Sequence, residues 1–238
     1  MHIPDGFVDA PVSIAAGAIA VGGVAFCLAG ARRTLDEKTA PMAGLAAAFI
    51  FAVQMINFPV AAGTSGHLLG GALAAILVGP YAGALAVTVV LVVQALLFAD
   101  GGLSALGLNV INMAFVTVIV GWFAFKALTK VLPRNRSGVV VASGIAAFLS
   151  VPAAALAFTL EYAIGGTGTF SVTQVLAAMT GVHVLIGIGE GIITALTVGA
   201  VVAVRPDLVF GARYLQGEQT LQTRTVAPAA PLADGGAR

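Results

Sequence analysis

Long apolar stretches dominate the sequence and restrict it to one class of fold. Only 9% of the 238 residues are charged, against roughly 25% in an ordinary soluble domain. We therefore predict an all-α, polytopic membrane protein, a helix bundle surrounded by the lipid bilayer. Six stretches are long enough to cross the hydrocarbon core as helices, and they cover residues 8–31, 42–59, 81–98, 108–128, 139–162 and 182–204.

A seventh apolar stretch, residues 68–79, is too short to cross a bilayer by itself. As a helix rising about 1.5 Å per residue it would cover roughly 18 Å of a core of roughly 30 Å. The basic residues indicate that it nevertheless crosses, because cytoplasmic loops collect Lys and Arg. With this crossing, all 11 Lys and Arg residues lie on one side. We predict seven transmembrane helices, with the N-terminus outside and the C-terminus in the cytoplasm.

Residues 60–67, just before the short stretch, have to supply the missing depth. We expect them to dip from the outer face into the protein, with His67 at the deepest point. Non-helical backbone is tolerated at that depth only where protein or a polar cavity surrounds it. An imidazole there either marks a functional site or bonds to nearby backbone. Gln54 and Asn57 are three residues apart, so we expect them to share a helical face beside this loop.

The first seven residues precede the first apolar stretch and place a histidine next to the chain terminus. They lack the positive region and the cleavage site of a secretory signal, so we expect Met1 to be the mature terminus. A Met-His start offers a metal ion three nitrogens: the α-amine of Met1, the deprotonated amide of His2, and His2 Nδ1. A planar set of nitrogens suits late divalent ions better than Mg²⁺, Ca²⁺, Mn²⁺ or Zn²⁺. Alternatively, His2 lies beside the lipid headgroups.

Other polar residues within the apolar stretches are open to more than one interpretation. Asn109 and Asn112 are three residues apart, and we expect them to form hydrogen bonds between helices. His183 and Glu190 are seven residues apart, hence on one face of the last helix. This pair could relay protons, or it could be a packing pair.

The sequence lacks the commonest motifs of nucleotide hydrolysis and of hydrolases. It contains no Gly-x-x-x-x-Gly-Lys-Ser/Thr loop, no His-Glu-x-x-His and no Gly-x-Ser-x-Gly. We therefore predict that the chain is not an enzyme. Its single cysteine, Cys27, cannot form a disulfide within one chain, and we expect no nucleic-acid partner. Residues 213–238 are polar and rich in Pro, Ala and Gly, so we predict a membrane domain of residues 1–212 and a disordered cytoplasmic tail.

Four motifs resemble those of the CbiM/NikM family, the substrate-binding membrane components of energy-coupling factor (ECF) transporters for cobalt and nickel. The resemblance spans residues 1–210 or so and leaves out the C-terminal tail. Its N-terminal motif and the motif around His67 are the most specific. The motifs are MHIPDG at residues 1–6, NFPV at 57–60, GTSGHLLGG at 63–71 and FADGG at 98–102.

The resemblance implies uptake of a divalent transition metal as the transported ligand, Co²⁺ or Ni²⁺, with cobalt favoured by the family. It implies a site made by the Met1 amine, the His2 amide nitrogen and side chain, and the His67 side chain. Asp5 and Asn57 lie in matching motifs and are candidates for groups around these ligands. The implied partners are a coupling membrane subunit and ATPase subunits, with a small accessory membrane subunit as a further one. No catalytic residue and no cofactor is implied.

Two other functions can be weighed against this one. A stand-alone metal channel or secondary carrier would need a polar path to the cytoplasm, yet the inner halves of the predicted helices are almost wholly apolar. A membrane enzyme could use His183 and Glu190, but the sequence contains no recognisable nucleophile or cofactor motif to accompany them.

Overall fold

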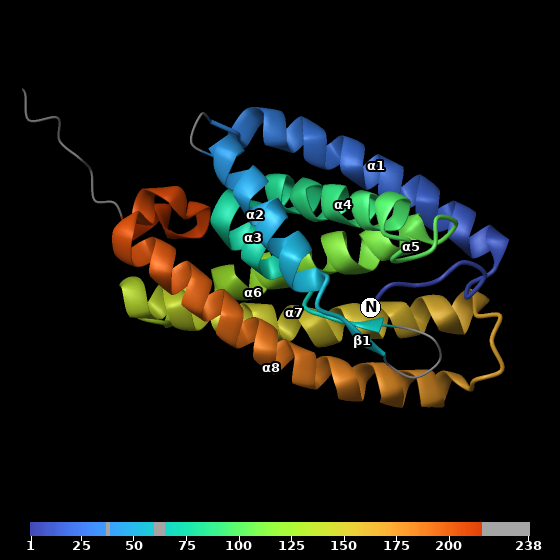
Figure 1. The fold of residues 1–238 in the computed structure, drawn as a ribbon. Coiled ribbons are helices and arrows are strands. Elements are labelled where there is room, and N and C mark those ends of the chain that lie inside the picture. The colour runs from blue at the N-terminus through green and yellow to red at the C-terminus, as the bar shows by residue number, and fades with distance from the viewer. Residues whose placement is uncertain (37–38, 60–64, 216–238) are drawn as a thin grey trace, which may run out of the picture.

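The computed structural model describes residues 1–36, 39–59 and 65–215, and within them the chain is almost entirely helical (Figure 1). The predicted all-α membrane class is confirmed, because five helical segments are long and apolar enough to cross a bilayer. These are α1 (Ala10–Thr34), α4 (Pro80–Leu97), α7 (Arg136–Gly165), α8 (Val172–Val204) and the continuous run Leu106–Val131. That run consists of α5 (Leu106–Asn109), the π-helix η2 (Val110–Val116) and α6 (Thr117–Val131).

The remaining elements are shorter. Strand β1 (Phe58–Pro59) pairs with strand β2 (Ser65–Gly66) in an antiparallel ribbon of two residues each. The elements are α2 (Thr39–Gln54), β1 (Phe58–Pro59), β2 (Ser65–Gly66), α3 (Gly71–Val78), and the 3-10 helices η3 (Pro206–Leu208) and η4 (Phe210–Leu215). The predicted tail therefore begins inside η4, and its residues 216–238 lie outside the described residues. Residues 60–64 of the expected dipping segment also lie outside them.

Helix α3 is even shorter than the predicted stretch of residues 68–79, with eight residues, and every one of them is buried. A helix that is apolar all round belongs in a protein core. Close packing with its neighbours depends on glycines. A Cβ on Gly83 of α4 would lie 2.8 Å from the backbone of Ala74, and one on Gly121 of α6 would lie 2.5 Å from Ala72 Cβ. The short helix therefore lies at the centre of the bundle, where α4 and α6 pack against it.

Two helix ends differ from the predicted ones in ways that matter for the site. Helix α8 begins ten residues before the predicted Val182, because Ser171 and Gln174 form a capping box at its N-terminus. Helix α2 ends at Gln54, so Asn57 lies beyond it. The expectation that Gln54 and Asn57 share a helical face was therefore wrong.

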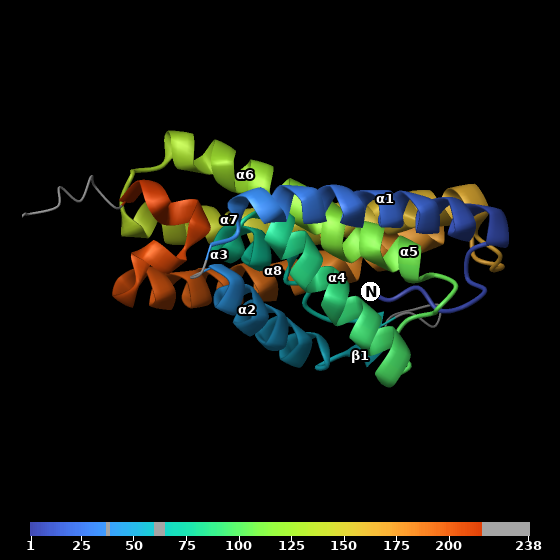
Figure 2. The same ribbon diagram turned by 90° about the horizontal axis from the view of Figure 1, so that it is seen from above.

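The N-terminal residues run into the bundle instead of along its surface. In Figures 1 and 2 the N-terminus lies between the helices, in the half of the molecule opposite η4. The backbone N–H of Asp9 donates to the carbonyl of Gly165 at 2.7 Å, and its carboxylate accepts from Val12 N at the start of α1. The Thr167 hydroxyl donates to the carbonyl of Gly6 at 2.6 Å. The turn between α7 and α8 thus holds the terminal segment in place.

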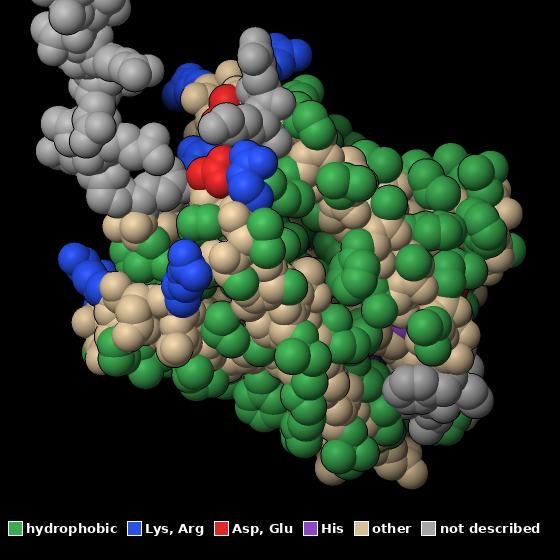
Figure 3. Space-filling model, turned by 60° about the vertical axis from the view of Figure 1, so that its left-hand side comes forward, with side chains coloured by type: hydrophobic (Ala, Val, Ile, Leu, Met, Phe, Trp, Pro, Cys, Tyr) green, Lys and Arg blue, Asp and Glu red, His purple; other side chains and the backbone are tan. Residues whose placement is uncertain are grey.

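The basic side chains that the structure describes gather at one end of the bundle. On the face shown in Figure 3, Lys and Arg lie towards one end, and hydrophobic side chains cover much of the rest. In Figure 1 the helix ends that carry these residues all lie at the left. The residues are Arg32 and Arg33 of α1, Lys126 and Lys130 of α6, Arg134 and Arg136 around the start of α7, and Arg205 and Arg213 after α8.

Candidate metal centre

The first three residues form a buried segment with a fixed backbone. Met1 is completely buried and His2 is 4% exposed. Asn109 binds both backbone polar groups of Ile3. Its Oδ1 accepts from Ile3 N at 2.7 Å, and its Nδ2 donates to Ile3 O at 3.2 Å. Gly102 N also donates to Ile3 O, at 2.9 Å. Asn109 therefore binds the terminal segment, and among the described residues its side chain does not form the interhelical hydrogen bond that we expected from its spacing.

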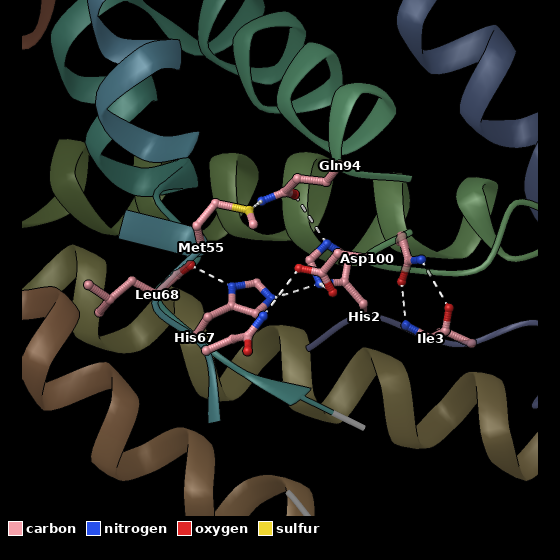
Figure 4. Close-up of polar contacts among 9 residues, drawn as sticks. His2, Ile3, Met55, His67, Leu68, Gln94 and Asp100 are labelled. Carbon is pink, nitrogen blue, oxygen red and sulfur yellow. Dashed lines mark hydrogen bonds and ion pairs between the residues drawn. The ribbon is translucent and has the colours of Figure 1, made fainter. Parts of the chain in front are cut away.

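The structure brings the two predicted histidines into contact. His67 lies in the loop between β2 and α3 and is 1% exposed. Its Nε2 is 3.1 Å from His2 Nδ1, and the two ring centroids are 4.7 Å apart (Figure 4). Its other ring nitrogen, Nδ1, is 2.8 Å from the carbonyl of Leu68. Since a carbonyl can only accept, His67 Nδ1 donates and His67 Nε2 keeps its lone pair.

Two residues that we did not assign to the site also contact His2. Gln94 of α4 places its Oε1 3.2 Å from His2 Nε2, and Asp100 places its Oδ1 3.2 Å from His2 Nδ1 (Figure 4). The loop carrying Asp100 can come this close only because a glycine follows it. Gly101 has φ +94°, and a Cβ there would lie 2.9 Å from His2 Cδ2. The sequence did contain a signal, the FADGG motif at residues 98–102.

His2 Nδ1 has two close neighbours in this arrangement, His67 Nε2 and Asp100 Oδ1. If His2 Nε2 donates to Gln94 Oε1, neutral His2 carries its lone pair on Nδ1. His2 Nδ1 then faces His67 Nε2 and Asp100 Oδ1, neither of which offers a proton. Acceptors held together in a buried place repel one another unless a proton or a metal cation lies among them. A proton on one of the ring nitrogens or a bound cation would each relieve this repulsion.

Electrostatics at the terminus favour neutral nitrogen donors beside one carboxylate. Burial lowers the pKa of the Met1 amine from 8.0 to about 4, although Asp100 opposes the shift. Burial likewise lowers the pKa of His2, again opposed by the contact with Asp100. Contact with His2 lowers the pKa of Asp100. At neutral pH the amine and the His2 imidazole are therefore uncharged, and the carboxylate is ionised.

The two candidate supporting residues, Asn57 and Asp5, have different hydrogen-bond partners. Asn57 Nδ2 donates to Asp100 Oδ2 at 3.4 Å, so Asn57 reaches the site through Asp100. The Asp5 carboxylate accepts from the backbone N–H and the hydroxyl of Ser104, at 2.7 and 2.6 Å. Asp5 thus ties the terminal segment to the loop after α4.

The side chains of His183 and Glu190 form hydrogen bonds with different partners. His183 is completely buried and its Nδ1 lies 2.7 Å from the carbonyl of Met179, one turn back on α8. Within the described part of the chain, its Nε2 has no hydrogen-bond partner. The Glu190 carboxylate accepts from the backbone N–H groups of Leu69 and Gly70. Glu190 is therefore connected to the loop that carries His67.

Polar and ionisable groups clustered inside a bundle of apolar helices define a class of protein. Such groups are costly in a membrane, and they mark the paths and binding sites of small ions and substrates. The fold and the cluster together define a multi-pass membrane protein with a buried group of polar and ionisable side chains.

Comparison with known proteins gives the family. Residues 2–208 match the family model CbiM, described as "Cobalt uptake substrate-specific transmembrane region". The chain belongs to the CbiM family, as its motifs led us to expect. It is a multi-pass protein of the cell membrane from a family of metal transport components, which is not a family of enzymes.

Individual relatives agree with this assignment. The chain is 43% identical over 209 residues to an Archaeoglobus fulgidus protein named "Putative fused nickel transport protein NikMN", covering 88% of this chain and 68% of that one. It is 35% identical over 219 residues to the cobalt transport protein CbiM of Geobacter sulfurreducens, covering 88% and 61%. A crystal structure of a transition metal transporter superimposes with a TM-score of 0.80 at 31% identity, covering 86% of this chain and 93% of that one.

Proposed function

We propose that this chain is the substrate-capture membrane subunit of an ECF-type importer for a divalent transition metal, with Co²⁺ as the favoured ion and Ni²⁺ as the alternative. One observation carries the proposal: His2 Nδ1 lies 3.1 Å from His67 Nε2 and 3.2 Å from Asp100 Oδ1, and both histidines are buried. The relatives named for nickel and cobalt transport support the class of ion.

The proposed ligands are four nitrogens in a plane: the Met1 amine, the His2 amide nitrogen, His2 Nδ1 and His67 Nε2. Adjacent donors of such a plane lie about 2.8 Å apart for metal–nitrogen distances of about 2.0 Å. His2 Nδ1 and His67 Nε2 are already 3.1 Å apart. A deprotonated His2 amide and the Asp100 carboxylate would supply negative charge, which offsets the cost of burying a divalent ion. Gln94, Asn109 and the Leu68 carbonyl would orient the ligands.

Metal binding by the purified chain tests this function directly. Titration of the detergent-solubilised protein, with the Met1 amine free, should show one tight site for Co²⁺ or Ni²⁺. Competition between the two ions then decides which is preferred, because planar nitrogen ligation suits both. A protein that is folded yet binds neither ion would overturn the proposal.

The proposed topology has seven crossings, with α2 and α3 among them, the N-terminus outside and the C-terminus in the cytoplasm. The gathering of the described basic residues at one end supports this orientation, since cytoplasmic loops are rich in Lys and Arg. The metal site lies in the opposite half of the molecule, where an ion would enter from outside.

Labelling of single cysteines should show this orientation. In a Cys27→Ser background, Leu103→Cys near the site and Arg134→Cys at the basic end both present exposed positions. A membrane-impermeant maleimide added to intact cells should label position 103, and it should label position 134 only after the membrane is opened. The reverse pattern would mean that the chain is inserted the other way round.

Transport should require partner subunits that supply energy. The chain has no phosphate-binding loop, so we expect it to bind metal and yet to accumulate little of it in cells that lack the partners. Coexpression of coupling and ATPase subunits should restore uptake of radioactive ⁵⁷Co²⁺. Rapid accumulation by the chain alone would instead favour a channel or a secondary carrier.

A further inference from the structure

We infer that Glu190 of α8 is a positioning residue for the metal site, holding the loop that carries His67 so that His67 Nε2 faces His2. The inference rests on the proposed function. It assigns a role to a buried glutamate that contacts neither His2 nor His67 through any hydrogen bond in the described part of the chain. Instead, its contacts are with the backbone just after His67.

The carboxylate of Glu190 binds two consecutive peptide groups. Its Oε2 accepts from Leu69 N at 2.5 Å and its Oε1 accepts from Gly70 N at 2.7 Å. Glu190 is only 2% exposed, so water does not compete for these bonds. The preceding carbonyl, that of Leu68, accepts from His67 Nδ1. The Leu69 N–H belongs to the same peptide group as this carbonyl, so the carboxylate holds the peptide group that binds His67 Nδ1 and the one after it.

The loop needs this partner because it leads directly into α3. The first N–H groups of a helix have no acceptor within the helix. The residue before α3 is Gly70, which has no side chain to cap the helix. Gly70 has φ +80°, and a Cβ there would lie 2.8 Å from Ile50, so a capping side chain could not be placed at this position. Glu190, from another helix, accepts from the N–H of Gly70 itself, immediately before α3, and a negative charge is favourable at the N-terminal end of a helix.

A second side chain holds the opposite side of the same backbone. Gln54, at the end of α2, donates its Nε2 to the carbonyl of Leu69 at 2.7 Å. Both the N–H and the C=O of Leu69 are therefore bound by side chains from different helices. A loop held from two sides cannot easily move His67, and a fixed ligand loses less conformational entropy when the metal binds.

The chemistry requires a carboxylate at position 190. A carboxylate has two accepting oxygens, whereas an amide has one and presents N–H groups on the other side. Glu190→Gln keeps the size of the side chain but leaves one loop N–H facing another donor. Glu161 of α7 offers a matched control. It is also a glutamate within a membrane helix, and it accepts from Asn112 Nδ2 of η2 at 2.6 Å instead of from the loop that carries His67.

The experiment compares Glu190→Gln, Glu161→Gln and the wild-type full chain, each with the Met1 amine free. For Co²⁺ or Ni²⁺, Glu190→Gln should weaken binding by about 10- to 100-fold, as loss of groups that orient ligands commonly does. Glu161→Gln should bind like the wild type. In Glu190→Gln, the visible absorption band of bound Ni²⁺ should shift towards that of His67→Ala, because the fourth nitrogen is poorly placed.

A double variant tests whether Glu190 acts through His67. If it does, Glu190→Gln combined with His67→Ala should bind metal no more weakly than His67→Ala alone, because coupled residues are not additive. Fully additive losses, or a wild-type affinity and absorption band in Glu190→Gln, would overturn the inference. If Glu190→Gln fails to fold, Glu190→Asp replaces it. The shorter carboxylate cannot reach both N–H groups, so an unchanged affinity and band would again contradict the role.

Amide hydrogen exchange separates this inference from the proposed function. Without any metal, the N–H groups of Leu69 and Gly70 should exchange slowly in the wild type and faster in Glu190→Gln. If the wild type binds neither Co²⁺ nor Ni²⁺, the proposed function fails, and with it the role of Glu190 in metal binding. Faster exchange in Glu190→Gln would then show only that the carboxylate holds the loop.

Discussion

Replacing His67 by Ala is expected to weaken binding of Co²⁺ or Ni²⁺ by more than about 100-fold, beyond the loss usual for a group that only orients ligands. The reason is geometric. His67 Nε2 is the nitrogen 3.1 Å from His2 Nδ1, and the other proposed ligands all come from the first two residues. Without His67 the metal keeps three nitrogens and takes water as its fourth ligand. Isothermal titration of the purified variant measures the loss.

The matched control for this variant is His183→Ala. The two histidines are equally buried, at 1% and 0% exposure, so both replacements leave a cavity of similar size. His183 bonds to the backbone of its own helix, and we expect its loss to change metal affinity much less. Thermal unfolding should show both variants folded. Binding that survives His67→Ala but is lost in His183→Ala would mean that His183, and not His67, is the ligand.

The helices could be predicted from the sequence because a bilayer imposes a strong and local rule. Apolar length alone located the five long segments, and it also indicated that the helix within residues 68–79 is short. The start of α8 was missed by ten residues, because the residues ahead of Val182 are less apolar. The Ser171 and Gln174 capping pattern was a usable signal for that start.

The histidine pair could be predicted, whereas most of the groups that hold it could not. His2 and His67 stand in specific motifs, and the structure places them in contact. Gln94 and Asn109 are single polar residues in apolar stretches, and they contact residues 92 and 106 positions away. Such pairings depend on how helices pack in three dimensions. No spacing in one sequence encodes them.

The partners of Glu190 and Glu161 also could not be predicted from the sequence. We grouped Glu190 with His183 because seven residues place them on one face of a helix. That geometry is real, yet each side chain points to a different partner. Glu190 binds a loop 120 residues earlier in the chain, and Glu161 of α7 binds Asn112. Helical spacing tells which residues share a face, but only the packed structure tells what that face meets.

An addition ahead of Met1 is expected to weaken metal binding as strongly as the loss of His67, by more than about 100-fold. One extra residue turns the α-amine into an amide and places chain where Met1 is already completely buried. Acetylation of the amine has the first effect with a much smaller addition. Both changes remove a neutral nitrogen donor, because burial holds the pKa of the Met1 amine at about 4.

Four forms of the protein separate the chemical effect from the steric one. They are the native terminus, the acetylated terminus, a form with one added glycine, and the same protein from which a tag has been cleaved to leave Met1 free. The acetylated and extended forms should lose tight binding of Co²⁺ or Ni²⁺, and cleavage should restore it. Loss in the extended form alone would mean that Met1 only needs space. Equal affinity in all four forms would remove the amine from the ligand set and would leave His2 and His67 as a pair of imidazoles. Two nitrogens do not fix a planar site, so the metal would then take its remaining ligands from water or from Asp100.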